Sequence, residues 1–214
     1  MLDLKERSDY NLQIVFVRHG ESMDNIGLPT PEGFDKEDTP LSDYGKQQAT
    51  MLSSAFECGE IAHIYSSPLT RTIQTVYPTA KKLGMNIELM PDLLEVGTKG
   101  KGCRKEMLEK DFSLAVQPAY SAADCLPENE TVQQITERAK RCIDYFKSAY
   151  SCGETILVAT HGTFFSHLLC AALGVKEDNL FRCQIDNCGC TVVTYRGEAR
   201  QAFLRTANNT NHIK

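Results

Sequence analysis

The sequence predicts an α/β fold, a three-layer α/β/α sandwich around a mainly parallel central sheet. Three observations support this prediction: short apolar runs alternate with segments of helical periodicity, no repeat or low-complexity tract interrupts them, and 42% of the 214 residues are hydrophobic. Strands that alternate with helices typically form a parallel sheet with helices on both faces. The length suits a single domain over residues 1–214, because a chain of this size buries about 70% of its surface without disulfide bonds.

The first half of the chain contains three predicted strands and two predicted helices. Residues 12–17 (LQIVFV) are apolar except for Gln13, which predicts a buried strand. Ser42 is a favourable N-cap, and the apolar positions after it have helical spacing as far as Phe56. The other elements of this half are a strand, a helix that Gly84 ends, and a strand, over residues 61–65, 69–83 and 86–90.

The second half contains the remaining elements and a segment that departs from the pattern. Thr131 and Gln134 have capping-box spacing and predict the start of a long helix. The elements that follow are a strand, a helix and two closing strands, over residues 155–159, 164–173, 190–195 and 202–206. Residues 91–130 carry several Gly and Pro, and we expect them to form a lid-like insertion. The polar residues 208–214 predict a frayed tail.

The charge and hydropathy of the chain exclude several classes of function. A net charge of −5 and a pI near 5.6 indicate no basic face that could bind nucleic acid or anionic lipid. No apolar run approaches the roughly 18 residues of a membrane span, and the first ten residues lack the apolar core of a signal peptide. We therefore expect a cytoplasmic protein with no nucleic-acid or membrane partner. Judged by this net negative charge alone, the chain would also be a poor binder of a phosphorylated ligand.

The cysteines predict neither a disulfide framework nor a metal site. There are nine of them, an odd number, and most lie in apolar helical or strand-like segments. Without a secretory signal they are expected to be reduced and buried. A zinc site would start from Cys183, Cys188 and Cys190, with His167 as a further ligand. The absence of a CxxC pair and of finger-like histidine spacing argues against zinc.

Two segments share one design, an apolar strand that ends in His-Gly. Residues 14–20 read IVFVRHG, and residues 156–162 read ILVATHG. Because ligands bind beyond the carboxyl ends of strands in open α/β sheets, His19 and His161 should project into the same crevice. The glycine after each histidine lets the backbone turn sharply and approach a ligand. A lone histidine is more often structural, but two in the same setting favour a functional site.

Two arginines accompany these histidines and predict a phosphate site. Arg18 directly precedes His19, and Arg71 lies at the start of a helix just past a strand end. A guanidinium presents a rigid fork of donors that suits phosphate oxygens. A helix N-terminus adds backbone N–H groups and partial positive charge. Either arginine alone would more commonly be a solvated surface residue, but with the strand-end histidines both predict a phosphate clamp.

These residues are part of an ordered set of motifs that resembles the histidine phosphatase (phosphoglycerate mutase-like) superfamily. The matching positions follow the family's order and are Arg18-His19-Gly20-Glu21, Asn25, Pro40-Leu41-Ser42, Gly45, Gln48-Ala49, Ser66-Ser67-Pro68-Leu69, Arg71, Thr75, Glu95 and His161-Gly162. An isolated RHG triplet would be weak evidence, whereas the ordered set is specific. The resemblance implies a single phosphoglycerate mutase-like domain, a phosphohistidine mechanism, and no metal or cofactor.

The resemblance also implies a role for each site residue. His19 would be the nucleophile and form a covalent phosphohistidine, which requires a neutral imidazole in one tautomer. Arg18, Arg71 and His161 would hold the phosphoryl oxygens through the transition state.

Two further residues complete the implied site. Asn25 would donate another hydrogen bond to the phosphoryl group. Glu95, which follows the predicted strand at 86–90, would protonate the leaving oxygen and later activate water.

Three functions stay open, and the sequence favours the first of them, a phosphomonoester hydrolase. The run Glu95-Val96-Gly97-Thr98-Lys99-Gly100 departs from the mutase pattern, in which a basic and aromatic cluster follows the Glu, and the chain has no Trp. A Gly-rich segment favours an entrance that admits water, as hydrolysis requires. The first alternative is a phosphoglycerate mutase that uses a 2,3-bisphosphoglycerate primer. The second is a non-catalytic module that binds a phosphorylated ligand, although no catalytic residue is missing here.

The substrate is expected to be a phosphorylated small molecule or a phosphoprotein. Lys99, Lys101, Arg104 and Lys105 follow the predicted acid closely, and position alone would make them a solvated loop face. A contact between some of them and a second anionic group would suit a phosphorylated sugar, sugar acid or phosphoamino acid. A wide entrance would instead admit a phosphorylated protein residue.

Overall fold

A seven-stranded sheet forms the centre of the computed structural model, which describes residues 10–36, 38–98, 105–116, 129–176 and 179–213. The strand order across the sheet is β4-β3-β2-β5-β1-β6-β7. The bounds are β1 (Leu12–Arg18), β2 (His63–Ser66), β3 (Ile87–Leu89), β4 (Ala115–Val116), β5 (Glu154–Thr160), β6 (Cys190–Arg196) and β7 (Gln201–Asn209). The strands from β4 to β1 pair in parallel, whereas β6 is antiparallel to both β1 and β7. The predicted, mainly parallel sheet is thereby confirmed.

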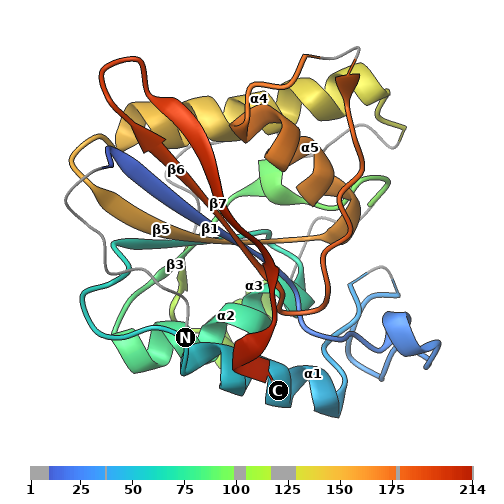
Figure 1. Cartoon of the computed structure of the whole chain (residues 1–214). Coiled ribbons are helices and arrows are strands. Elements are labelled where there is room, and N and C mark those ends of the chain that lie inside the picture. The colour runs from blue at the N-terminus through green and yellow to red at the C-terminus, as the bar shows by residue number, and fades with distance from the viewer. Residues whose placement is uncertain (1–9, 37, 99–104, 117–128, 177–178, 214) are drawn as a thin grey trace.

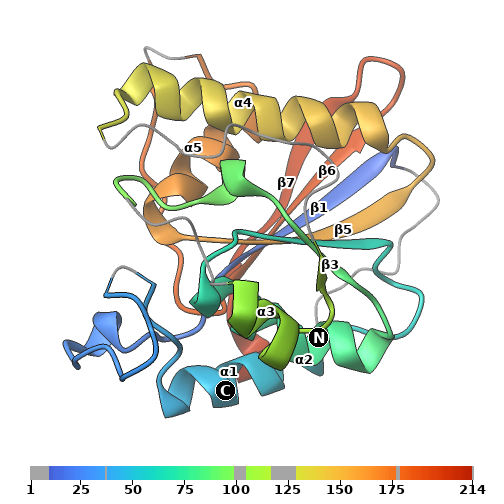
Figure 2. The ribbon, with the colours of Figure 1, turned by 180° about the vertical axis from the view of Figure 1, so that it is seen from behind.

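Helices cover both faces of this sheet. They are α1 (Asp43–Ser53), α2 (Thr70–Leu83), α3 (Lys105–Asp111), α4 (Val132–Ala149) and α5 (Gly162–Ala172). Figure 1 and the view from behind in Figure 2 show α4 and α5 on one face, with α1, α2 and α3 on the other. The three-layer α/β/α sandwich is therefore confirmed. Within the ranges that the structure describes, no helix is long and apolar enough to cross a membrane.

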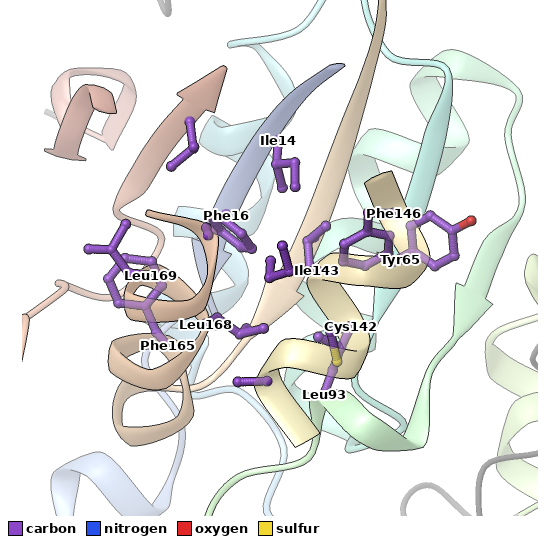
Figure 3. Close-up of a cluster of buried hydrophobic side chains, with 14 of the residues drawn as sticks. Ile14, Phe16, Tyr65, Leu93, Cys142, Ile143, Phe146, Phe165, Leu168 and Leu169 are labelled. Carbon is purple, nitrogen blue, oxygen red and sulfur yellow. The ribbon is translucent and has the colours of Figure 1, made fainter. Parts of the chain in front are cut away.

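The alternating side chains of β1 divide the core into two halves. Ile14 and Phe16 point toward α4 and α5, where they pack with residues such as Phe146 and Leu168 (Figure 3). Val15 and Val17 belong to the other buried cluster, against α1, α2 and α3. Because both faces of the strand are buried, residues 12–17 are apolar except for Gln13, whose buried side chain donates to the Thr155 hydroxyl at 3.3 Å.

Local signals in the sequence fix one end of each of three helices, namely the starts of α1 and α4 and the end of α2. The Ser42 side chain accepts a hydrogen bond from the Gly45 amide at 3.0 Å and caps α1. Thr131 and Gln134 form the predicted reciprocal capping box at the start of α4. Gly84 ends α2 with a φ of 66°, in the left-handed region that glycine adopts without strain.

Part of the expected insertion at 91–130 forms regular structure. The short 3₁₀ helix η3 (Pro91–Leu93) follows β3, and α3 and β4 extend the sheet and its cover at one edge. β4 pairs in parallel with β3. Of the basic cluster predicted in this segment, Lys99, Lys101 and Arg104 lie outside the described residues, and Lys105 begins α3.

The prediction of a frayed tail from residue 208 is wrong. β7 continues to Asn209, and the 3₁₀ helix η5 (Asn211–Ile213) follows it. The Asn208 amide nitrogen donates to Asp186 at 2.9 Å, and the His212 ring nitrogen Nε2 donates to the Cys188 carbonyl at 3.0 Å. These specific polar contacts hold a polar segment in place, although its composition resembles that of a mobile end.

Candidate active site

The strands β1 and β5 bring the two His-Gly sequences together. Arg18 and Thr160 are partners in the parallel register, so both strands end at the same level. The His19 amide then donates to the Thr160 carbonyl at 3.0 Å. The imidazole rings of His19 and His161 lie with their centroids 5.3 Å apart. The two histidines thus share one site beyond the carboxyl ends of adjacent strands.

The environment of His19 favours a neutral imidazole in one tautomer. Its Nδ1 lies 2.7 Å from the Gly20 carbonyl oxygen, which can only accept a hydrogen bond. The proton is therefore on Nδ1, and Nε2 keeps its lone pair. Burial and then the nearby charge of Arg71 lower the pKa of His19 well below the ordinary 6.5. His19 is accordingly an uncharged base and potential nucleophile at neutral pH.

Gly20 lets the chain turn directly after this histidine. A Cβ at this position would lie 2.9 Å from the Gly45 carbonyl oxygen in α1, which is too close for any other residue. The Gly20 amide donates to the Thr75 hydroxyl in α2 at 2.9 Å. The first and second helices therefore both contact the turn that carries His19.

His161 is fully buried and also neutral. Its Nε2 lies 2.8 Å from the Ser67 hydroxyl, while its Nδ1 is buried with no hydrogen-bond partner among the described residues. Burial is the largest cause of a pKa well below 6.5, and the charge of Arg71 adds to it. If Ser67 donates to Nε2, the ring proton is on Nδ1, where it can be donated to a ligand.

Two arginines place positive charge around these rings. Arg18 ends β1, and its Nη1 donates to the Ile185 carbonyl at 2.9 Å. Arg71 is the second residue of α2. Burial lowers the pKa of both guanidinium groups, whereas the nearby carboxylate of Glu95 raises it. Both side chains stay cationic because the ordinary pKa of 12.5 lies far above neutral.

Asp38 fixes the start of α2, a contact that sequence reasoning missed. Its carboxylate is 5% exposed and accepts from both the backbone amide and the hydroxyl of Thr70, each at 2.6 Å. Thr70 directly precedes Arg71. Burial raises the pKa of Asp38, and the hydrogen bonds from Thr70 oppose that rise. Nothing in the sequence spacing links residue 38 with the helix 32 residues later.

Glu95 lies at the N-terminus of α5, directly beside His161. Its Oε1 accepts from the Phe164 amide at 2.9 Å, and its Oε2 from the Thr163 amide at 3.2 Å. These carboxylate contacts satisfy amides that have no partner within the helix. They explain why α5 begins at Gly162, two residues before the predicted start. They also hold the carboxylate at the cavity that Arg18 and Arg71 line.

Asn25 lies in the short 3₁₀ helix η2 (Asp24–Ile26) and belongs to a network that the sequence did not predict. Its Oδ1 accepts from the Ser22 amide at 3.2 Å and from the Asn187 side chain at 3.1 Å. The same Asn187 nitrogen donates to the His19 carbonyl at 2.9 Å. The oxygen of Asn25 is thus occupied, and its amide nitrogen is left for a ligand. Asn187 lies in an irregular segment, without a motif that could have indicated it.

A cavity of about 650 Å³ joins most of the predicted site residues, but the fully buried His161 is not part of its lining. The predicted residues that line it are Arg18, His19, Asn25, Arg71 and Glu95. The residues that sequence reasoning missed come from η2 and its flanks, from α4 and α5, and from the segment before β6; they are Ser22, Asp24, Val132, Gly162, Thr163, Ser166, His167, Cys170, Leu180, Phe181, Arg182, Cys183, Gln184 and Ile185. The lining therefore combines the cationic side chains of the predicted site with polar and apolar side chains from other segments.

The thiols and candidate metal ligands that the structure describes do not form a metal-binding cluster. In the part of the chain that the structure describes, no three His, Cys, Asp or Glu side chains are arranged to hold a metal ion. The residues described include Cys183, Cys188, Cys190 and His167. The seven described cysteines are free, and four of them are buried.

The comparisons with known proteins agree with this geometry. The model of the histidine phosphatase superfamily (branch 1) matches residues 14–209. A curated relative, the probable phosphoglycerate mutase GpmB of Shigella dysenteriae, is 28% identical over 208 residues, 94% of this chain and 95% of that protein. Another, with the same printed name, from Cronobacter sakazakii, is 26% identical over 212 residues, again 94% of this chain and 95% of that protein.

Solved structures share the fold at lower identity. Phosphoserine phosphatase of Entamoeba histolytica, solved with 3-phosphoglyceric acid, has a TM-score of 0.65 at 20% identity, covering 95% of this chain and all of that one. A mycobacterial glucosyl-3-phosphoglycerate phosphatase has a TM-score of 0.67 at 20% identity, covering 92% and 99%. Likeness at this identity concerns the fold alone. Since the family model matches most of the sequence, the chain belongs to the histidine phosphatase superfamily, branch 1.

Proposed function

We propose that this protein is a phosphomonoester hydrolase that acts through a phosphohistidine on His19, without a metal. One observation carries the proposal: two buried, neutral imidazoles lie 5.3 Å apart, next to two arginines that line the same cavity. Neutral imidazole is the form that can attack phosphorus, and fixed cations are what the phosphoryl oxygens need. Membership of the superfamily and phosphatases among the structural neighbours support the same activity.

The first step transfers the phosphoryl group to the protein. His19 Nε2 forms a bond to phosphorus while the bond from phosphorus to the ester oxygen breaks. Arg18, Arg71 and the Nδ1–H of His161 hold the three equatorial oxygens, whose charge must be stabilised throughout. The Asn25 amide donates a further hydrogen bond.

The second step releases phosphate. Glu95 has given its proton to the leaving oxygen in the first step, and as a carboxylate it now takes a proton from water. The resulting hydroxide attacks phosphorus, the bond from phosphorus to His19 breaks, and the neutral imidazole is restored. Because the Gly20 carbonyl accepts from Nδ1, the ring keeps the same tautomer for the next cycle.

Hydrolysis is favoured over phosphoryl transfer to a second hydroxyl by the size of the cavity. Its volume of about 650 Å³ lies within the range of about 300–1,000 Å³ that is typical of a site for a whole small ligand. A cavity of this size leaves room for water beside a small bound product, whereas a mutase must exclude water from its phosphohistidine. The names of the curated relatives make the mutase the second candidate.

The test is phosphate release from p-nitrophenyl phosphate and a panel of phosphomonoesters, with EDTA present. His19→Ala should abolish release and the acid-labile phosphoryl label on the protein. His63→Gln is a matched control, because His63 pairs with Glu88 at the opposite end of β2 and should leave the rate unchanged. Conversion of 3-phosphoglycerate only with a 2,3-bisphosphoglycerate primer would make the protein a mutase. Turnover that persists in His19→Ala would refute the nucleophile, and phosphate binding without turnover would indicate a binding module.

A further inference from the structure

We propose that the active-site cavity has a preformed apolar compartment for the leaving group, so that the substrates are phosphomonoesters of extended alkyl or aryl alcohols. The compartment is lined by an apolar wall, which consists of Val132, Cys170, Leu180 and Phe181. This inference rests on the proposed hydrolase activity and goes beyond it by naming the substrate class.

The apolar wall exposes hydrophobic side chains to water, which is unfavourable unless a ligand covers them. Val132 is 61% exposed and Phe181 is 42% exposed, although they come from different parts of the chain and line one cavity. A single exposed apolar side chain needs no explanation, but several that converge on a cavity indicate a binding surface. In the proposed reaction the phosphoryl group contacts Arg18, His19 and Arg71, which leaves the apolar wall for another part of the substrate. The rest of the cavity therefore has a different chemistry from the phosphate site.

Polar contacts with α5 hold the segment that carries Phe181 in place. Ser166 accepts from the Cys183 amide at 3.0 Å and donates to the Cys183 carbonyl at 3.2 Å. One turn later on the same helix, the Cys170 thiol donates to the Phe181 carbonyl at 3.6 Å. Ser166 and Cys170 lie four positions apart on α5, and their contacts hold the irregular segment against this helix. The wall thus exists before a ligand binds, which lowers the cost of binding.

Polar groups line the same cavity as the apolar wall, His167 and Arg182 among them. His167 lines the cavity, its Nδ1 lies 3.2 Å from the Thr136 hydroxyl, and burial lowers its pKa, so the ring is neutral. Arg182 is exposed, and its apolar stem can lie along a ligand while its guanidinium stays in water. A polar three-carbon acid would leave Val132 and Phe181 in contact with water. A longer alkyl chain or an aromatic ring would cover them.

The experiment measures kcat/KM for unbranched alkyl phosphates from ethyl to octyl. We expect an increase of about two- to fourfold per methylene, because each buried CH₂ contributes about that factor. Phe181→Ser and Val132→Ser should flatten this increase. Phe203→Ser is the matched control, since Phe203 is 40% exposed on β7 and lies outside the cavity lining. It should keep the full increase.

Direct binding supplies a second readout. Alkylphosphonates, which cannot be hydrolysed, should bind His19→Ala more tightly as the chain lengthens, with an increasingly negative heat-capacity change. A rate that is flat or falls with chain length in the wild type, or a slope that survives in Phe181→Ser, would overturn the apolar compartment. A failure of the proposed activity looks different, because then no ester, ethyl and p-nitrophenyl phosphate included, would release phosphate.

Discussion

Replacing Arg138 by Met tests the packing behind the site most directly. Arg138 is fully buried in α4, and its guanidinium donates to both carboxylate oxygens of Glu130, at 2.8 and 2.6 Å. Its Nη1 also donates to the carbonyls of Asp92 and Leu94, each at 2.8 Å. The ring of Phe164 lies 3.9 Å from its central carbon. One cation therefore joins α4, α5 and the segment before Glu95.

The expected loss of stability follows from these contacts. Arg138→Met leaves the side chain of Glu130, which is 4% exposed, without its partner. Breaking a buried ion pair from one side costs about 3–5 kcal/mol. The two carbonyls that lose a donor add roughly 1 kcal/mol or more. We expect the free energy of unfolding to fall by about 5 kcal/mol, which corresponds to roughly 10–20 °C in Tm for a chain of this size.

Urea denaturation measures this change. Glu137→Met is the control, because Glu137 is exposed on the same helix, where its hydrogen bond from Gln133 is open to solvent, and its replacement should alter stability by less than about 0.5 kcal/mol. The double variant Arg138→Met with Glu130→Leu should recover about half of the loss, since no carboxylate is then buried alone. A single variant that costs under 2 kcal/mol, or a double variant no more stable than the single, would refute this account.

Arg138 also supports Glu95 indirectly. It holds the carbonyl of Leu94, the neighbour of Glu95, and it packs on Phe164, whose amide donates to Glu95. The folded double variant should therefore lose more activity with alkyl phosphates, which need a proton on the leaving oxygen, than with p-nitrophenyl phosphate. An equal loss with both substrates would show that Arg138 does not position the acid.

Three further changes have defined outcomes. Burial lowers the pKa of His19 and His161, so below pH 6.5 the unfolded chain binds protons that the folded chain does not. Stability should thus fall by about 2 kcal/mol from pH 7 to 5.5, and by less in His161→Asn. Urea denaturation that gives the same free energy of unfolding at both pH values would contradict this. Glu95→Gln should slow alkyl phosphate hydrolysis by about 10²–10⁴-fold and p-nitrophenyl phosphate hydrolysis by under tenfold, in steady-state assays. Asp38→Asn should cost about 2 kcal/mol in urea denaturation, because charge-assisted bonds to Thr70 are lost.

The sequence predicts well those parts of the molecule that follow from local patterns. The apolar runs before His19 and His161 indicated buried strands, and parallel register then brings both residues to one level. Arg71 followed in the same way from a strand that precedes a helix. Such residues can be predicted because the hydrophobic pattern indicates where a strand ends and the capping residues indicate where a helix begins.

Residues that act across the chain without such a pattern were missed. Asn187 and Phe181 lie in an irregular segment, where no periodicity says which side chain faces the cavity. Asp38 contacts Thr70 through a fold that brings distant segments together. By composition the residues around His212 resemble a mobile end, so the hydrogen bond from His212 to Cys188 could not be predicted. Each of these positions depends on tertiary packing, which local propensity does not encode.

The acidic net charge of the chain does not decide what the cavity binds. Surface charges are screened over about 8–10 Å at physiological salt, whereas Arg18 and Arg71 line the cavity itself. Burial lowers the pKa of these arginines and of His19 and His161 alike. Starting from 12.5, the arginines remain charged, but starting from 6.5, the histidines become neutral. The same desolvation therefore separates the two roles that phosphoryl transfer requires, cations that hold the phosphoryl group and an uncharged nitrogen that attacks it.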